Sequence, residues 1–109
     1  MTEREVLTEF YRHTLGGKWN RNTNWLSELR AGKWYGVEVD ISGHIVSINL
    51  NDNKLVGKIN YDEMFISKLH ALERLHLMSN ALSGYIPSSI RNLKSLTELN
   101  LAWNQLIGS

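Results

Sequence analysis

The chain has 109 residues, enough for one domain with one modest hydrophobic core. Its twelve Lys and Arg residues against eleven Asp and Glu residues leave a net charge of +1, so no overall field favours nucleic acid or an acidic membrane as a partner. Cysteine is absent, whereas small secreted domains usually depend on disulfide bonds. Together with a polar N-terminus that lacks the features of a signal peptide, this absence predicts a cytoplasmic location.

The first segment has the signals of an amphipathic helix. Thr2 and Glu5 have the spacing of a capping box, in which two residues satisfy each other's backbone N–H groups. Gly16 and Gly17 are expected to end the helix. Its buried face is expected to consist of four apolar residues: Val6, Leu7, Phe10 and Tyr11.

The segment that follows is rich in tryptophan and is expected to form a cap. Trp19 and Trp25 lie among asparagines in a stretch without a regular period, so we expect a loop whose rings, with Trp34, form a small core. Residues 34–40 alternate like a β-strand, and a turn after them leads into a second strand, which predicts a hairpin. Residues 1–44 are therefore expected to cover the open end of the structure formed by the rest of the chain.

Residues 45–109 contain two full copies and a partial third copy of one pattern. Each copy has three leucine or isoleucine residues spaced as L-x-x-L-x-L, followed by asparagine, leucine and glycine at fixed intervals. The asparagines are Asn53, Asn80 and Asn104, which places the copies 27 residues (80 − 53) and 24 residues (104 − 80) apart. An amphipathic helix also has leucines three residues apart, but it gives no reason for asparagine and glycine to recur in phase with them. The repeat therefore predicts a solenoid in which each copy forms one coil.

The residue types of one coil suit a short strand followed by a bend. In the second copy Leu75 and Leu77 point to one side of the strand, where the next coil buries them, and Arg74 and His76 point to the other. The asparagine is expected where the backbone turns inward, so the three copies form a ladder of amides that satisfies buried backbone groups. The glycine suits a backbone position with positive φ.

These copies resemble the plant-type leucine-rich repeat, whose pattern is L-x-x-L-x-L-x-x-N-x-L-x-G-x-I-P and which residues 72–87 match throughout. The segments FYRHT, NWL and WYGVEVD resemble that family's N-terminal cap. The resemblance implies an α/β fold: a short right-handed leucine-rich-repeat solenoid with parallel strands on its concave face, capped by an N-terminal helix and a β-hairpin. The domain organisation is then a cap at 1–44 and repeats at 45–109.

Two features depart from the family pattern. Extracellular members have a pair of cysteines that would fall near Gly32 and at Val39, so this cap resembles the cysteine-free versions and loses that argument for secretion. In the first repeat Asn60 replaces the proline, and residues 61–68 include three extra positions. We expect a helical turn there, with three apolar residues packed inward: Met64, Phe65 and Leu69.

The resemblance implies recognition of a protein or peptide partner on the concave strand face. A mixture of Arg, His, Met and Trp suits a protein interface, and a solvated face without a partner is the alternative. The residues expected on this face are Ser47, Asn49, Asn51, Arg74, His76, Met78, Glu98, Asn100 and Ala102, with Trp103 at its rim.

No enzymatic motif is recognisable, so we expect neither catalytic residues nor a cofactor. His76 and Glu98 can meet on adjacent strands as an acid–base pair in principle, but an ordinary cross-strand contact is the simpler interpretation. The four histidines have no metal-ligand spacing, so no metal site is expected: His13, His44, His70 and His76.

The third copy suggests an alternative role in assembly. Leu99, Leu101 and Leu106 should face a neighbouring coil, and no further copy of the pattern follows them. Apolar side chains of this size are normally covered. A homo-oligomer formed through this end of the solenoid is therefore the second hypothesis.

Overall fold

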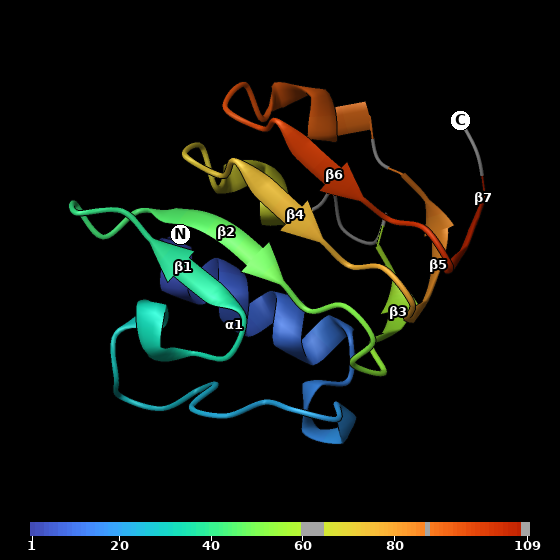
Figure 1. Ribbon diagram of the computed structural model, residues 1–109, viewed down its shortest axis with the longest axis horizontal. Coiled ribbons are helices and arrows are strands. Elements are labelled where there is room, and N and C mark those ends of the chain that lie inside the picture. The colour runs from blue at the N-terminus through green and yellow to red at the C-terminus, as the bar shows by residue number, and fades with distance from the viewer. Residues whose placement is uncertain (60–64, 87, 108–109) are drawn as a thin grey trace.

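The computed structural model describes residues 1–59, 65–86 and 88–107 (Figure 1). Short strands stack from one coil to the next, and helical segments lie on the other side of the coils. The elements are α1 (Glu3–His13), η1 (Gly16–Lys18), η2 (Ala31–Lys33), β1 (Val37–Val39), β2 (Ile45–Asn49), β3 (Val56–Lys58), η4 (Phe65–Lys68), β4 (Arg74–His76), β5 (Ala81–Tyr85), η5 (Ser88–Asn92), β6 (Glu98–Asn100) and β7 (Gln105–Ile107).

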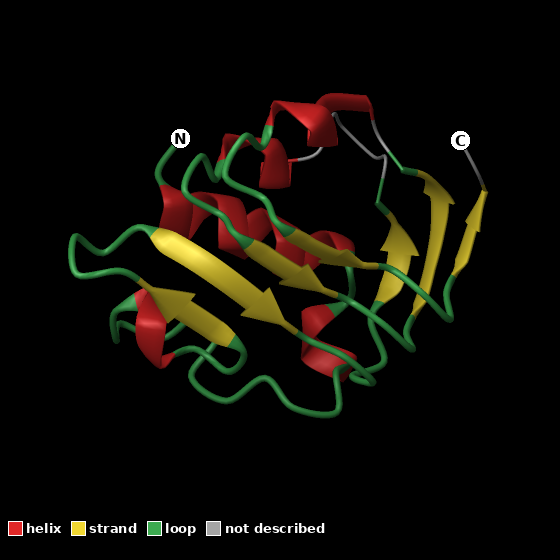
Figure 2. Cartoon of the chain, turned by 45° about the horizontal axis from the view of Figure 1, so that its top comes forward, coloured by secondary structure: helices red, strands yellow, loops and turns green. Residues whose placement is uncertain are grey.

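Two sheets run along the stacked coils. The first has the order β1-β2-β4-β6, in which β1 pairs antiparallel with β2 and the other pairs are parallel. The second has the order β3-β5-β7 and is parallel throughout. Figure 2 shows the sheets as two sides of the same coils. The parallel strands, the N-terminal helix and the hairpin confirm the expected fold, whereas the second sheet has no counterpart among the expectations from the sequence.

The leucine positions of the repeat form the core, as predicted. Ile48 pairs in register with Leu75, and Leu75 pairs with Leu99. Ile48 and Leu75 are 0% and 1% exposed, whereas Leu99 is 41% exposed. Because equivalent side chains stack from coil to coil, Leu75 is covered by neighbours on both sides, and Leu99 has a described neighbour on one side only.

The predicted asparagine ladder is present. The Asn80 side-chain oxygen accepts hydrogen bonds from the backbone N–H groups of Asn53 and Leu55, both at 3.0 Å. Its Nδ2 donates to the carbonyls of Leu50 and Leu77, also at 3.0 Å. One amide therefore satisfies backbone groups of two neighbouring coils, which would otherwise be left unpaired inside the protein.

Asn104 and Asn53 extend the ladder in opposite directions. Asn104 accepts from the Leu82 N–H at 2.9 Å and donates to the Leu77 carbonyl at 2.8 Å. Asn53 bonds to the cap instead: its oxygen accepts from the Arg21 N–H and its Nδ2 donates to the Arg21 carbonyl, both at 2.8 Å. The first rung thus joins the repeats to the cap loop.

The repeat glycines have the predicted positive φ where they are described. Gly57 has φ 147° and Gly84 has φ 86°, and Gly108 lies outside the described residues. At Gly57 a Cβ would overlap the His13 carbonyl oxygen. This glycine therefore also lets the end of α1 approach β3 closely.

Helix α1 begins with the predicted capping box. The Glu5 N–H donates to the Thr2 hydroxyl at 3.1 Å, and the Thr2 N–H donates to the Glu5 carboxylate at 2.7 Å. The second bond stabilises the carboxylate and so lowers the pKa of Glu5 from its ordinary value. None of the described helices is long and apolar enough to cross a membrane.

The expected end of this helix is wrong. α1 ends at His13, and Leu15, not a glycine, has the left-handed φ of 56° that turns the chain away. Gly16 has a different reason to be glycine, because a Cβ there would overlap the ring of Tyr11. The glycines follow the end of the helix, and Gly16 leaves room for the Tyr11 ring beside the turn.

Three tryptophans form the core of the cap, as predicted. Trp19, Trp25 and Trp34 are all buried, and the centroid of the Trp25 ring lies 4.8 Å from that of Trp19 and 5.1 Å from that of Trp34. Each indole N–H donates to a backbone carbonyl, so each ring also ties two parts of the loop together. The acceptors are the carbonyls of Thr14 at 2.9 Å, Tyr35 at 2.9 Å and Leu29 at 3.2 Å.

The hairpin strand is shorter than the sequence pattern predicts. Strand β1 covers Val37–Val39, not all of 34–40, and its register with β2 shifts between Glu38 and Val39. Gly36, which precedes the strand, has a φ of 82°. The position requires glycine because a Cβ there would overlap the Asn49 carbonyl oxygen. β1 of the cap belongs to the same sheet as the repeat strands, so the sheet continues across the predicted boundary between the cap and the repeats. The division into a cap at 1–44 and repeats at 45–109 therefore stays a prediction.

The inserted segment of the first repeat is described in part. Met64 and the side chain of Phe65 lie outside the described residues, as do Asn60 and the rest of 60–64. The expected helical turn corresponds to the 3-10 helix η4, and Leu69 is buried as predicted. Ile66, at 1% exposed, also packs inward here.

Candidate binding face

The candidate face is formed by the outward side chains of β2, β4 and β6, which lie side by side in Figure 1. Parallel pairing places equivalent residues of the three coils in rows across the strands. The first row is Ser47, Arg74 and Glu98, and the second is Asn49, His76 and Asn100. Beyond the strands, backbone hydrogen bonds from Asp52 to Met78 and from Ser79 to Ala102 keep the coils in the same order.

The first row is held by ion pairs around Arg74. Its guanidinium lies 3.6 Å from the Glu38 carboxylate on β1 and 3.2 Å from that of Glu73. Ser47 stands in register between Glu38 and Arg74 and is 5% exposed. The expectation that Ser47 offers a contact is therefore wrong, because its longer neighbours on both sides cover it.

Glu38 belongs to the face although the repeat pattern does not include it. The hairpin register places it opposite Ser47, which brings it to the edge of the first row. The alternation of residues 34–40 was the signal, because a strand paired with β2 must present every second side chain on the same face.

His76 and Glu98 contact each other in the predicted way. The His76 Nε2 lies 2.9 Å from the Glu98 carboxylate, and the two residues sit diagonally on adjacent strands. Both side chains are partly open to solvent, at 27% and 54% exposed. This geometry is that of an ordinary cross-strand side-chain contact on an open face.

The asparagines of the face are fixed by their own backbone surroundings. Asn49 accepts from the Asn51 N–H at 3.2 Å, Asn51 accepts from the Met78 N–H at 2.7 Å, and Asn100 accepts from the Ala102 N–H at 3.1 Å. A side chain that is already held loses little conformational freedom when a partner binds. The amides at the centre of the face are therefore already oriented by the backbone around them.

Trp103 projects from the rim of the face and is 79% exposed, whereas the three tryptophans of the cap are buried. Its φ of 58° is left-handed. Asp52 and Ser79, at 51° and 61°, occupy the equivalent corners of the preceding coils. Left-handed backbone favours glycine, asparagine and aspartate, so a tryptophan at such a corner is unusual.

The leucines expected to mediate self-association are exposed to different degrees. Leu99 is 41% exposed, while Leu101 and Leu106 are partly buried and pack against the core. Together with Ala102, Trp103 and Ile107 they line an open groove on the last described coil.

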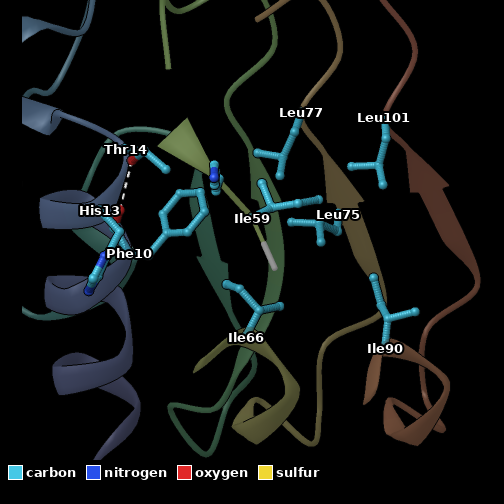
Figure 3. A pocket seen from close by; sticks show the side chains of 10 residues that line it. Phe10, His13, Thr14, Ile59, Ile66, Leu75, Leu77, Ile90 and Leu101 are labelled. Atoms are coloured by element: carbon cyan, nitrogen blue, oxygen red, sulfur yellow. Dashed lines mark hydrogen bonds between the residues drawn. The ribbon is translucent and has the colours of Figure 1, made fainter. Parts of the chain in front are cut away.

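A cavity between α1 and the repeats is too small to be the binding site. Figure 3 shows Phe10 from the helix facing Ile66, Leu75 and Leu77 across it. Its volume is about 20 Å³, room for a single water molecule, and its walls are almost wholly apolar. Among the residues that the structure describes, no three His, Asp or Glu side chains converge as they would around a metal ion.

Comparison with known proteins agrees with this architecture. Residues 71–93 match the model of the Leucine Rich Repeat family. Phytosulfokine receptor 1 from Arabidopsis thaliana is 32% identical over 106 residues, which cover 95% of this chain and 10% of the receptor. The chain is a plant-type leucine-rich-repeat protein. It spans a tenth or less of the length of the curated relatives that it matches.

Solved structures of plant leucine-rich-repeat ectodomains have the same fold. The PEPR1–AtPEP1 structure superimposes with a TM-score of 0.78 at 25% identity, over 95% of this chain and 15% of that one. The HAESA ectodomain of Arabidopsis, solved with a peptide hormone ligand, also has a TM-score of 0.78, at 23% identity over 97% of this chain and 18% of that one.

The predicted cytoplasmic location is wrong. The relatives are receptors and receptor-like proteins, and the matching structures include the ectodomain of a receptor kinase, which lies outside the cell. The prediction rested on the absence of cysteine and on a polar N-terminus without signal-peptide features, and the relatives overturn it.

Proposed function

We propose that this leucine-rich-repeat protein is a binding module without catalytic activity, and that it holds a peptide or protein partner on its concave face outside the cell. The observation that carries the proposal is the fixed order of side chains on that face, where ion pairs and backbone hydrogen bonds hold Arg74, His76, Asn51 and Asn100. The HAESA ectodomain, with its peptide hormone ligand, is a relative in fold that binds a peptide.

The arrangement of the face favours binding of an extended segment. Parallel strands present side chains in straight rows, and a partner that lies along one coil meets one member of each row in turn. On the last described coil, the charged Glu98 and the amide of Asn100 on β6 are followed by the apolar Ala102 beyond the strand. Such an ordered change of chemistry gives a partner both a position and a direction.

Panning of a random peptide library against the purified protein tests the proposal. Selected peptides are titrated against two concave variants, His76→Ala and Asn100→Ala, and two convex variants, Ser88→Ala and Lys94→Ala. We expect the concave variants to weaken binding by about tenfold and the convex variants to leave it unchanged. Equal losses from both pairs would contradict the concave face as the binding surface.

Self-association through Leu99, Leu101 and Leu106 stays a second prediction, favoured by the exposure of Leu99. Light scattering at increasing protein concentration measures it directly. Leu99→Glu is expected to keep the protein monomeric where the unmodified chain forms dimers, because a charge in an apolar contact is costly. Leu29→Glu is the matched control, since Leu29 is 49% exposed in the cap. An unmodified chain that stays monomeric at every protein concentration measured would rule out self-association through these leucines.

A further inference from the structure

Apolar residues gather at one end of the concave face, where the chain leaves β4 and β6. We call Met78, Ala102 and Trp103 the Trp rim. The Asn100 side chain lies 3.6 Å from the Met78 sulfur, and a hydrogen bond of 3.0 Å from Ser79 to the Ala102 carbonyl joins the two coils. The rim is thus a fixed apolar edge directly beside the amide row of the face.

Trp103 has no structural reason of its own to be tryptophan. Its left-handed backbone disfavours a large side chain, and with 79% of the residue exposed, burial gives little in return. The equivalent corners hold the small polar residues Asp52 and Ser79. Large aromatic residues with this exposure are the kind that carry binding energy when a partner covers them.

Carboxylates dominate the opposite end of the face. Glu38 and Glu73 lie 3.6 and 3.2 Å from the Arg74 guanidinium, and Glu98 lies 2.9 Å from His76. Three carboxylates stand against one guanidinium here, so negative charge is in excess at this end. The side chains of Glu38 and Glu98 are 71% and 54% exposed, so their carboxylates can reach a partner. Charge complementarity therefore calls for a cation at this end.

The two ends are separated by the length of a short peptide. Glu98 is the first residue of β6, and Ala102 lies four residues further along the chain, which corresponds to about 13 Å at ~3.3 Å per residue of extended chain. A peptide that lies extended along the strands covers this distance in about four residues.

We infer that the concave face takes an extended peptide in which a Lys or Arg side chain meets Glu98 and an apolar side chain, about four residues away, packs on the Trp rim. The inference rests on the proposed function and gives that function a partner chemistry.

The first arm of the test is the composition of peptides selected from a random dodecapeptide display library. We expect enrichment of Lys or Arg followed or preceded, about four residues away, by an apolar residue. Enrichment of Asp or Glu, or of apolar residues alone, would overturn the inference while leaving concave binding in place. If no peptide is enriched, both the inference and the proposed function fail.

The second arm uses variants at each end of the face, tested with a synthetic copy of the most enriched peptide. Glu98→Gln should weaken binding by about tenfold and remove most of its dependence on NaCl concentration. Trp103→Ala should weaken binding by about tenfold and leave the salt dependence unchanged. The matched controls are Glu28→Gln and Ile41→Ala, which alter an exposed carboxylate and an exposed apolar residue in the cap.

These outcomes separate the two claims. If both concave-face variants bind the peptide as well as their controls, the cationic and apolar contacts are wrong. If Lys94→Ala on the convex side costs as much as His76→Ala, the concave face is not the binding surface and the proposed function fails with the inference. Because Glu98 and Trp103 are exposed, their replacement is expected to leave the melting temperature unchanged, which distinguishes lost contacts from lost folding.

Discussion

The cap and the repeats bury apolar side chains in different ways. In the repeats, aliphatic residues such as Leu75 recur at fixed intervals and stack on their equivalents in the next coil. In the cap, Trp19, Trp25 and Trp34 pack on one another at individual angles, and each indole N–H reaches one particular carbonyl. The repeats therefore spread their stability over many similar contacts, whereas the cap concentrates its stability in a few large rings.

The two regions also satisfy buried backbone groups differently. The repeats use one asparagine per coil, and Asn80 shows the full arrangement of accepted and donated bonds. The cap uses indole N–H groups and loop backbone. Asn53 connects the two hydrogen-bonding arrangements, because it is the first asparagine of the ladder and bonds to Arg21 in the cap. The comparison teaches that a periodic region tolerates partial loss better than a region held by a few unique contacts.

The largest loss of folding stability is expected from a substitution in the cap. Trp34→Ala should lower the free energy of unfolding by about 4 kcal/mol, because Trp34 is 2% exposed and its removal leaves a cavity and an unpaired Leu29 carbonyl. Trp103→Ala, at the exposed rim, should change it by less than about 0.5 kcal/mol. Urea denaturation measures both. Similar losses would show that the rings of the cap are not its core.

The next largest loss is expected in the repeat core. Leu75→Ala should cost about 3 kcal/mol, as for other fully buried leucines. Leu99 occupies the same row one coil further on and is 41% exposed, so Leu99→Ala should cost less than about 1 kcal/mol. Equal shifts in the denaturation midpoint would contradict the strand register.

A disulfide bond placed in the cap should stabilise the protein. A Cβ built at Gly32 would lie 3.9 Å from the Val39 Cβ, which matches the ~3.8 Å of natural disulfides. The pair Gly32→Cys and Val39→Cys occupies the positions where the resemblance places the cysteines of extracellular members. Oxidation of the double variant should add about 2 kcal/mol of stability, since the bond closes a short loop.

Mass spectrometry under non-reducing conditions and melting with and without dithiothreitol check this cross-link. A melting temperature that rises only in the oxidised sample is the expected result. Thiols that stay reduced in air would show that the two positions are not in contact.

An effect of similar size to that of the disulfide bond is expected in the ladder. Asn80→Ala should cost about 2 kcal/mol, because it leaves backbone groups of two coils without partners. Asn49→Ala is the matched control and should be nearly neutral, since Asn49 accepts from Asn51 on the exposed side of the strand. If the two variants melted at the same temperature, the ladder would not be a structural device.

Features with a local or periodic cause could be predicted from the sequence. The capping box needs only Thr2 and Glu5 at the right spacing, and the ladder needs only asparagines that recur in phase with leucines. The concave rows follow from alternation along a strand, so nearly all the candidate binding residues could be named in advance. The second sheet escaped prediction because each of its strands is short and lies next to a glycine, a pattern that also suits a loop.

Other features depend on contacts between distant parts of the chain. The hairpin brings Glu38 to Arg74, and that ion pair covers Ser47, which alternation alone assigns to the open face. Leu15, not a glycine, has the left-handed φ where the chain turns after α1, and Gly16 leaves room for the ring of Tyr11. The sequence by itself determined the repeat, its register and its buried face, because these follow from spacing. Only the tertiary structure decided which polar side chains pair and which of them, Ser47, is covered, because these depend on neighbours that no interval in the sequence defines.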